Sequence, residues 1–369
     1  MTPSDPGVDL GLDLGLDPAI ERHPLVASAH RLAAILLAPA AEAVDGSTVP
    51  RSHLDALGAA GLLGIAAPET AGGTQAPPSV ARRVTEVLAG ADLSTWFVQA
   101  QHHGPVRALA AAGTHPELLA DLAAGRTVAG TAFSHLRRAD GPVRAGRERD
   151  GWRLDGTAPW YTGWGLNDVA LVGAATPDGQ VVTGLVAAQE SPGVRAGDPV
   201  RVAAVQAART VPLLLDGHLL ADADVVAVRP VGEWARDDAR VTVNASPAVF
   251  GLTESAILLL ACGAPGRPAE PVAVAAARRL AARLVAVRGA VRHLLDDVPP
   301  DEEVPRRLEL RAQAGRLAVE ATTALVVAGA GGAMSLASPA QRKVREAVFL
   351  LVQAQTRPAR VAALDAVGR

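Results

Sequence analysis

The sequence is poor in cysteine, lysine and aromatic residues. Its 369 residues include one cysteine, Cys262, and one lysine, Lys343. A single cysteine excludes an intramolecular disulfide, a cysteine-rich metal site and a CxxC redox pair, and no other pattern predicts a metal site. Its place in the apolar run AILLLAC favours a small buried side chain. The net charge is −3 and no basic tract is present, which is not typical of nucleic-acid-binding proteins.

The chain also lacks the basic segment and apolar run that begin a secretory signal peptide. One charge-free stretch, residues 321–340, has about the length of a membrane span. Its second half, GAGGAMSLASPA, is small, polar and interrupted by proline, which favours a buried helix that ends in a glycine-rich loop. We therefore expect a cytoplasmic protein with no membrane partner.

The sequence is rich in alanine, valine and leucine, and its hydrophobic content of 49% indicates a globular chain with much helix. The biased repeat GVDLGLDLGLDP predicts a disordered tail over residues 1–22. Helical spacing of apolar residues predicts an N-terminal helical domain over 23–127. Short β-type runs separated by Asp-Gly turns predict an antiparallel β domain over 128–231. Four long helical segments predict a C-terminal four-helix bundle over 232–369, which makes the fold class α+β and mainly α.

The few aromatic rings are concentrated in one segment. The chain has five Trp, one Tyr and four Phe, and four of these ten rings lie between Trp152 and Trp164. A strand alternates sides, so the spacing predicts that Trp160 and Thr162 lie on one face. Two interpretations remain open from the residues alone: a packed β corner, or one wall of a site for a flat ligand.

Four segments resemble one known family. They are LDALGAAGLLGIAAPETAGG (54–73), GWRLDGTAPWYTGWGLNDVALVGA (151–174), VVAGAGG (326–332) and QRKVREAVF (341–349). Together with the order helices, β domain, helical bundle, they resemble the acyl-CoA dehydrogenase superfamily of flavoproteins, from about residue 54 to the C-terminus. The resemblance implies an FAD between the β domain and the bundle. It also implies a homodimer or homotetramer.

Mapped onto this sequence, the resemblance implies flavin contacts on both sides of the cofactor. Trp160 stands where the family packs a ring against the isoalloxazine, and Thr162 where a hydroxyl meets the flavin edge. Phe133 and Ser134 stand where the chain meets the pyrimidine ring. The cofactor-binding residues implied are Phe133, Ser134, Trp160, Thr162, Gly331, Gly332 and Thr356.

The catalytic half of the site departs from the family. Removing the α-proton of an acyl thioester needs a carboxylate, and the usual glutamate position falls on Ala354. A second position, which some members use, falls near Val241 and is not acidic either. His135 replaces a family glutamate and is a candidate acid or base because it titrates near neutrality. The alternative is a histidine at the surface, or one that contacts site residues and not the substrate.

Three functions remain open. The first is a flavin-dependent oxidoreductase that acts on the CH–CH group of an acyl thioester or related small molecule with a non-standard base. The second is a flavin monooxygenase on the same fold, for which FMN replaces FAD. The third is a catalytically silent subunit that binds flavin or a partner.

Overall fold

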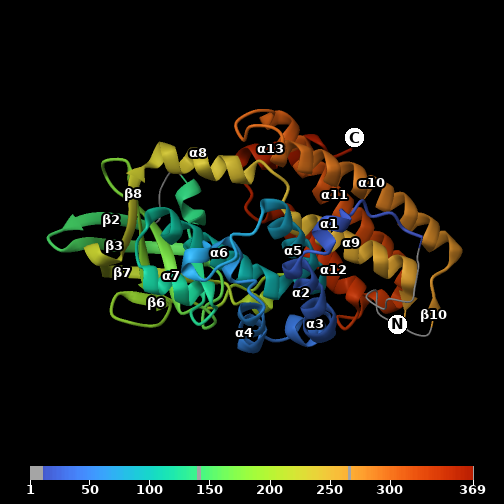
Figure 1. Cartoon of the computed structure of the whole chain (residues 1–369), viewed down its shortest axis with the longest axis horizontal. Coiled ribbons are helices and arrows are strands. Elements are labelled where there is room, and N and C mark those ends of the chain that lie inside the picture. Colours follow the sequence, from blue (N-terminus) through green and yellow to red (C-terminus); the bar gives the residue numbers. More distant parts are fainter. Residues whose placement is uncertain (1–10, 139–142, 265–266, 369) are drawn as a thin grey trace. The chain divides into compact units, whose positions relative to one another are not determined.

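The chain folds into two compact units, and neither is one continuous stretch. The structure is a computed structural model that describes residues 11–138, 143–264 and 267–368. One unit, here the helical unit, comprises Met1–Asp45, Arg82–Leu93 and Ala239–Arg369; the other, the sheet unit, comprises Gly46–Ala81 and Ser94–Asp238. Figure 1 labels helices α5 (Pro78–Ala91), α6 (Leu93–Ala112) and α8 (Val231–Thr242). Each of the three includes residues of both units. This division separates helices that the sequence places together in residues 23–127, because periodicity does not show which helices pack on which.

The sheet unit is built on one mixed sheet. Its strands are β1 (Ala129–Ala132), β2 (Val143–Glu148), β3 (Gly151–Tyr161), β4 (Val169–Ala175), β5 (Gln180–Ala187), β6 (Val194–Ala196), β7 (Val211–Ala221) and β8 (Val225–Pro230). The order is β6-β7-β3-β2-β4-β5-β8, with β1 paired to β4. Most neighbours are antiparallel, as predicted, but β1 and β2 both run parallel to β4. The parallel pairs arise because β2 and β3 form a hairpin within the connection from β1 to β4.

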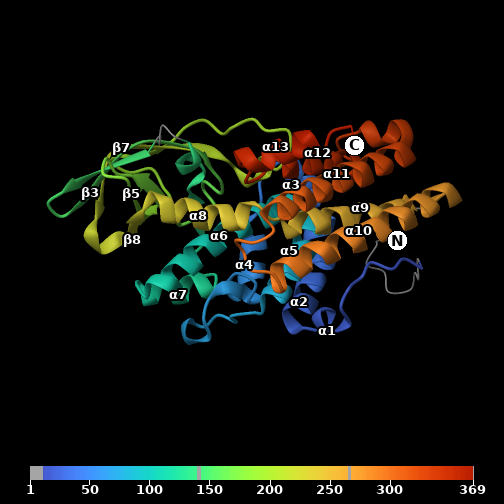
Figure 2. The ribbon, with the colours of Figure 1, turned by 90° about the horizontal axis from the view of Figure 1, so that it is seen from above.

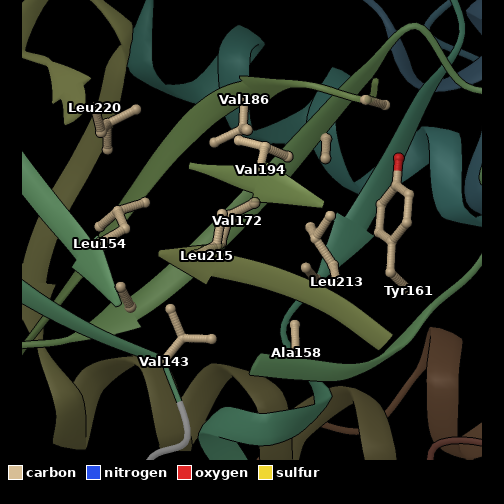
Figure 3. Close-up of a cluster of buried hydrophobic side chains, with 14 of the residues drawn as sticks. Val143, Leu154, Ala158, Tyr161, Val172, Val186, Val194, Leu213, Leu215 and Leu220 are labelled. Atoms are coloured by element: carbon tan, nitrogen blue, oxygen red, sulfur yellow. The ribbon is translucent and has the colours of Figure 1, made fainter. Parts of the chain in front are cut away.

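Alternating side chains give this sheet a buried face. Figure 3 shows Leu154 and Ala158 of β3, Val172 of β4, and Leu213 and Leu215 of β7 gathered in one cluster. Each fully buried Val or Leu side chain contributes roughly 1.5–3 kcal/mol relative to an exposed one. The cluster therefore fixes the register of β3, the strand that carries the aromatic segment.

Helices cover another part of the sheet. α6 and α7 (Pro116–Ala123) pack on β1, β4 and β5 through a core that includes Val106, Leu122 and Leu171. His102 of α6 joins these elements, because its Nε2 donates to the Leu122 carbonyl (3.2 Å) and its Nδ1 accepts from the Ala129 amide (3.1 Å). Burial lowers the pKa of His102 to about 4, so the ring is neutral and has one donor and one acceptor, as both bonds require.

The helical unit contains the predicted C-terminal bundle. Helices α9 (Pro247–Cys262), α10 (Pro271–Asp296), α11 (Val304–Gly329) and α12 (Pro339–Val352) pack side by side, and α13 (Arg357–Asp365) adds to α11 (Figure 2). α2 (Pro24–Leu32), a π-helical turn (Ala33–Leu37) and α3 (Ala38–Asp45) complete the N-terminal part of the unit. The mainly helical fold class and the four-helix bundle are thus confirmed.

A buried charge cluster lies inside this unit. Arg83 Nη1 of α5 lies 3.1 Å from Glu86 and 3.0 Å from Glu254 of α9, and Arg288 of α10 lies 2.5 Å from Glu254. Removing one partner from such a cluster leaves a buried uncompensated charge, which costs several kcal/mol, about 3–5.

The N-terminal segment contributes to the same cluster. Arg288 donates to the carbonyl of Leu14 (2.9 Å), and Glu21, at the end of α1 (Pro18–Glu21), lies 2.5 Å from Arg83. Residues 11–22 therefore differ from the disordered tail expected over 1–22, and residues 1–10 lie outside the described part of the chain. The anchoring arginines lie far away in the sequence, so the local repeat could not reveal them.

Three helical stretches are long and apolar enough to cross a membrane by length and composition alone: Pro24–Asp45, Val231–Cys262 and Val304–Met334. About two thirds of the apolar window in Val231–Cys262 (67%) is buried within the protein. Core packing therefore accounts for the apolar composition of this stretch. The window in Val304–Met334 is mainly open, because α11 becomes exposed towards its C-terminal end. The buried helix expected over 321–340 is therefore found only at its beginning.

Candidate functional site

The aromatic segment ends β3 with one open ring and one buried ring. Trp160 is 53% exposed, whereas Tyr161 is fully buried and stands edge-on to Trp164, with 6.2 Å between ring centroids. The Tyr161 hydroxyl accepts a hydrogen bond from Asn167 Nδ2 (3.1 Å), which also donates to the Thr162 carbonyl (2.9 Å). Burial raises the pKa of Tyr161, so the phenol stays neutral. The segment is thus rigid, and Trp160 is its exposed ring.

Thr162 does not share the exposure of Trp160. β3 ends at Tyr161, its register against β7 shifts between Ala158 and Tyr161, and the alternation of sides stops there. Thr162 is 3% exposed, and its hydroxyl lies 3.0 Å from that of Thr210. This bond leaves the Thr162 hydroxyl able to make a further one, because a hydroxyl can donate and accept at the same time. Its predicted flavin contact remains a prediction.

The turn that follows depends on glycine. Gly163 has φ of +90°, and its amide donates to the Ala208 carbonyl (2.8 Å). A Cβ there would lie 2.4 Å from Asn167 Nδ2, the group that holds Tyr161 and the Thr162 carbonyl. Any side chain at position 163 would therefore disturb the support of the aromatic segment.

The second predicted segment lies beside the first. β3 packs against β1 and against the 3-10 helix η4 (Ser134–Arg137), so the chain at Phe133 and Ser134 adjoins the strand of Trp160. Phe133 and Ser134 are both half-buried. His135 is 1% exposed, and its Nε2 donates to the carbonyl of Gly173 (2.7 Å). Burial lowers the pKa of His135, which favours a neutral ring engaged with the backbone over an acid or base in contact with substrate.

The remaining predicted residues belong to the helical unit. Gly331 and Gly332 lie in η7 (Ala330–Met334) and are exposed, and a Cβ at either would meet no atom within 4 Å. Thr356 is the N-cap of α13, and its hydroxyl accepts from the Ala359 amide (3.4 Å).

The family's glutamate position, Ala354, lies in the turn between α12 and α13. Ala354 has φ of +50°, a left-handed conformation that is unfavourable for alanine. Arg311 of α11 donates to the carbonyls of Gln353 (2.9 Å) and Ala354 (3.3 Å). It also donates to the carbonyls of Thr242 and Asn244, which follow Val241, the second family position. The structure thus brings both segments to one guanidinium, and neither supplies a carboxylate.

The residues present fit a flavin in part. An exposed indole offers an apolar face for a flat polarisable ring, and the open glycines of η7 leave the backbone accessible. The hydroxyl assigned to the flavin edge is already hydrogen-bonded to Thr210. No group of three or more His, Cys, Asp or Glu residues in the described ranges is arranged to hold a metal ion.

Comparisons with known proteins agree with this geometry. Residues 21–125 match the family model described as acyl-CoA dehydrogenase, N-terminal domain. The fold is similar to butyryl-CoA dehydrogenase from Megasphaera elsdenii over 97% of this chain and 100% of that one, with TM-score 0.79 and 16% identity. Residues 21–125 thus resemble an acyl-CoA dehydrogenase N-terminal domain, and the chain as a whole has the acyl-CoA dehydrogenase fold.

Two further solved structures have a similar fold. Glutaryl-CoA dehydrogenase from Mycobacterium smegmatis in complex with FADH2 has 18% identity and TM-score 0.75, covering 96% of this chain and 95% of that one. FkbI, described as acting in biosynthesis of the methoxymalonyl extender unit of Fk520, has 21% identity and TM-score 0.73, covering 91% and 98%. No curated protein sequence matches the chain significantly. At these identities the likeness shows the fold of this chain and not its reaction.

Sequence reasoning missed the residues that support the predicted ones. Asn167, Thr210, Gly173 and Arg311 each contact a predicted residue or its neighbour through the fold. Asn167 is close enough in the sequence to have been found, because an asparagine after a Gly-rich turn commonly bonds nearby backbone. The other three are 38 or more residues from their partners, and no local pattern marks them.

Proposed function

We propose that this chain is a member of the acyl-CoA dehydrogenase superfamily that binds FAD, and that it is a flavin-dependent oxidoreductase acting on a CH–CH group of an acyl thioester or related small molecule. The observation that carries the proposal is the fold match to butyryl-CoA dehydrogenase across 97% of the chain, combined with the exposed ring of Trp160. A bound FAD would accept the hydride that leaves the substrate. A homodimer or homotetramer is part of the proposal, by analogy with the family.

The residues of this chain would hold and orient the cofactor. Trp160 would stack on the ring system, and Phe133 and Ser134 would meet its pyrimidine edge. Gly331, Gly332 and Thr356 of the helical unit would contact the remainder through open backbone and a hydroxyl. Local contacts support the assignment of Trp160, Phe133 and Ser134. Tyr161, next to Trp160, is held by a hydrogen bond from Asn167, and η4, next to Phe133, is held by the bond from His135 to Gly173.

The proton acceptor would be non-standard. The α12–α13 turn carries Gln353, Ala354, Gln355 and Thr356, none of which can take a proton at neutral pH. This turn favours a second candidate, a flavin monooxygenase on the same fold with FMN, since that reaction needs no carboxylate to remove an α-proton. A silent flavin-binding or partner subunit is the third candidate, and it also agrees with Ala354.

Spectroscopy of the purified protein separates the three. For the oxidoreductase we expect a yellow protein whose flavin absorbance is bleached anaerobically by an acyl-CoA thioester. A monooxygenase would resist bleaching but consume oxygen when a reductase supplies reduced flavin, and a silent subunit would do neither. A colourless protein that takes up neither FAD nor FMN would overturn both enzyme candidates.

A further inference from the structure

Three consecutive side chains of the short helix η4 contact other elements of the sheet unit. His135 donates through Nε2 to the carbonyl of Gly173 on β4 (2.7 Å). Leu136 packs with Val181 and Trp234 in a small buried cluster. Arg137 forms a two-pronged pair with Asp238, with both N···O distances 2.8 Å. These contacts reach two strands and a helix, so η4 is held in both position and direction.

Gly173 is shaped to receive η4. A Cβ at this position would lie 2.6 Å from Leu136 Cδ1 and 2.9 Å from Phe133 Cδ1, closer than real Cβ contacts allow. The same residue provides the carbonyl that His135 binds. Gly173 therefore allows both the close approach of η4 to β4 and the hydrogen bond that fixes it.

The hydrogen bond defines the state of the His135 ring. A carbonyl accepts, so Nε2 carries the hydrogen and Nδ1 has only its lone pair. Nδ1 is buried and has no hydrogen-bond partner among the residues that the structure describes, so a second proton there would find no acceptor among them. The ring is therefore a neutral donor, and the residue is committed to the backbone of β4.

We propose that His135 is a positioning residue that seats η4 on β4 and thereby sets the places of Phe133 and Ser134. Its link to the cofactor rests on the proposed function, which assigns Phe133 and Ser134 to the flavin. His135 acts through these two residues and does not itself exchange a proton with substrate.

The test compares His135→Leu, which removes the donor, with His135→Gln, whose amide nitrogen can replace Nε2. Gly173→Ala is a second, independent variant, because it displaces η4 without altering the histidine. His293→Gln is the matched control, since His293 is exposed and pairs with nearby Asp297. Amide hydrogen exchange of the segment around residues 133–138 is measured in flavin-free protein, and the Kd for FAD is then measured by fluorescence quenching.

We expect His135→Leu and Gly173→Ala to speed exchange of this segment by about tenfold and to weaken FAD binding by a similar factor, as loss of one buried hydrogen bond implies. His135→Gln should recover most of both effects, and His293→Gln should show neither. Unchanged exchange in both His135→Leu and Gly173→Ala would show that these residues do not hold η4 on β4. Faster exchange with an unchanged Kd would overturn the positioning role. If the unsubstituted protein bound no flavin, the proposed function and the link to the cofactor would both be wrong. The exchange measurement alone would still decide whether His135 holds η4 on β4.

Discussion

Arg311 of α11 donates hydrogen bonds to the carbonyls of Gln353 and Ala354, and so holds the turn between α12 and α13. The same side chain reaches the carbonyls of Thr242 and Asn244. The turn thus keeps a fixed shape although position 354 has no charged side chain to anchor it. Its backbone conformation and its chemistry can be tested separately.

The backbone of the turn leads to a stability prediction. Alanine at φ +50° carries the steric cost of the left-handed region, roughly 1–2 kcal/mol, which glycine avoids. We expect Ala354→Gly to raise the free energy of unfolding by about 0.5–1 kcal/mol, since greater freedom of glycine in the unfolded chain offsets part of the gain. Urea unfolding measures this. Ala347→Gly, inside α12, is the control and should lose about 1 kcal/mol from helix propensity and more from its buried methyl group. A loss of equal size at both positions would show that the strain is not relieved.

The chemistry of the turn leads to a second prediction. If the proposed oxidoreductase lacks only an efficient proton acceptor here, Ala354→Glu should supply one without a new backbone cost, because both residues have a Cβ. We expect anaerobic bleaching of bound flavin by an acyl-CoA thioester to become at least about tenfold faster than in the unsubstituted protein, the lower part of the range for a positioned base. Ala354→Gln has nearly the same shape but takes no proton, and it should show no gain. Equal rates in the two variants would mean that position 354 is not where the substrate loses its proton.

The exposed ring gives a third prediction. Trp160→Ala removes an aromatic face that would stack on the flavin, and such contacts contribute about 0.5–1.5 kcal/mol beyond burial. We expect the Kd for FAD to rise by about tenfold, with little change in unfolding because the ring is 53% exposed. Trp160→Phe should have a Kd for FAD between those of the unsubstituted protein and Trp160→Ala. Trp152→Ala is the control, since the face of Trp152 is covered by Arg147. The guanidinium carbon of Arg147 lies 5.3 Å from the centroid of the Trp152 ring. Unchanged flavin retention in Trp160→Ala would remove Trp160 from the site.

The sequence predicted the elements of the fold better than their partners. Hydrophobic period and turn residues predicted the β domain and the helical bundle, because each depends on side chains a few positions apart. They could not predict that β1 pairs parallel to β4, since a hairpin in the connection decides that. They likewise could not predict the register shift near the end of β3, where the exposed Trp160 is followed by the buried Thr162.

The candidate site shows the same limit. The aromatic segment and the missing glutamate were visible as letters in the sequence. The contacts of His135 and Thr162 were not visible there, because each depends on a distant partner. Gly173 is 38 residues from His135, and Thr210 is 48 residues from Thr162. A histidine beside a predicted site is a candidate acid or base from its pKa alone. Only the fold shows that this ring is buried and donates to a backbone carbonyl.

The N-terminal segment gives the last prediction, on stability and pH. Burial acts to raise the pKa of Glu21, but the hydrogen bond from His30 and the charge of Arg83 outweigh it and lower the pKa to about 2 from 4.5. A lowered carboxyl pKa contributes stability that is present above about pH 4.5 and is lost as the pH falls towards 2. We expect Glu21→Gln to cost about 2 kcal/mol at pH 7, allowing for partial exposure of the carboxylate, and much less at pH 3. Urea unfolding at the two pH values measures the difference, with the exposed Glu42→Gln as a control that should cost little at either. A cost for Glu21→Gln that is the same at pH 7 and pH 3 would contradict the ion pair, because only the ionised carboxylate holds Arg83.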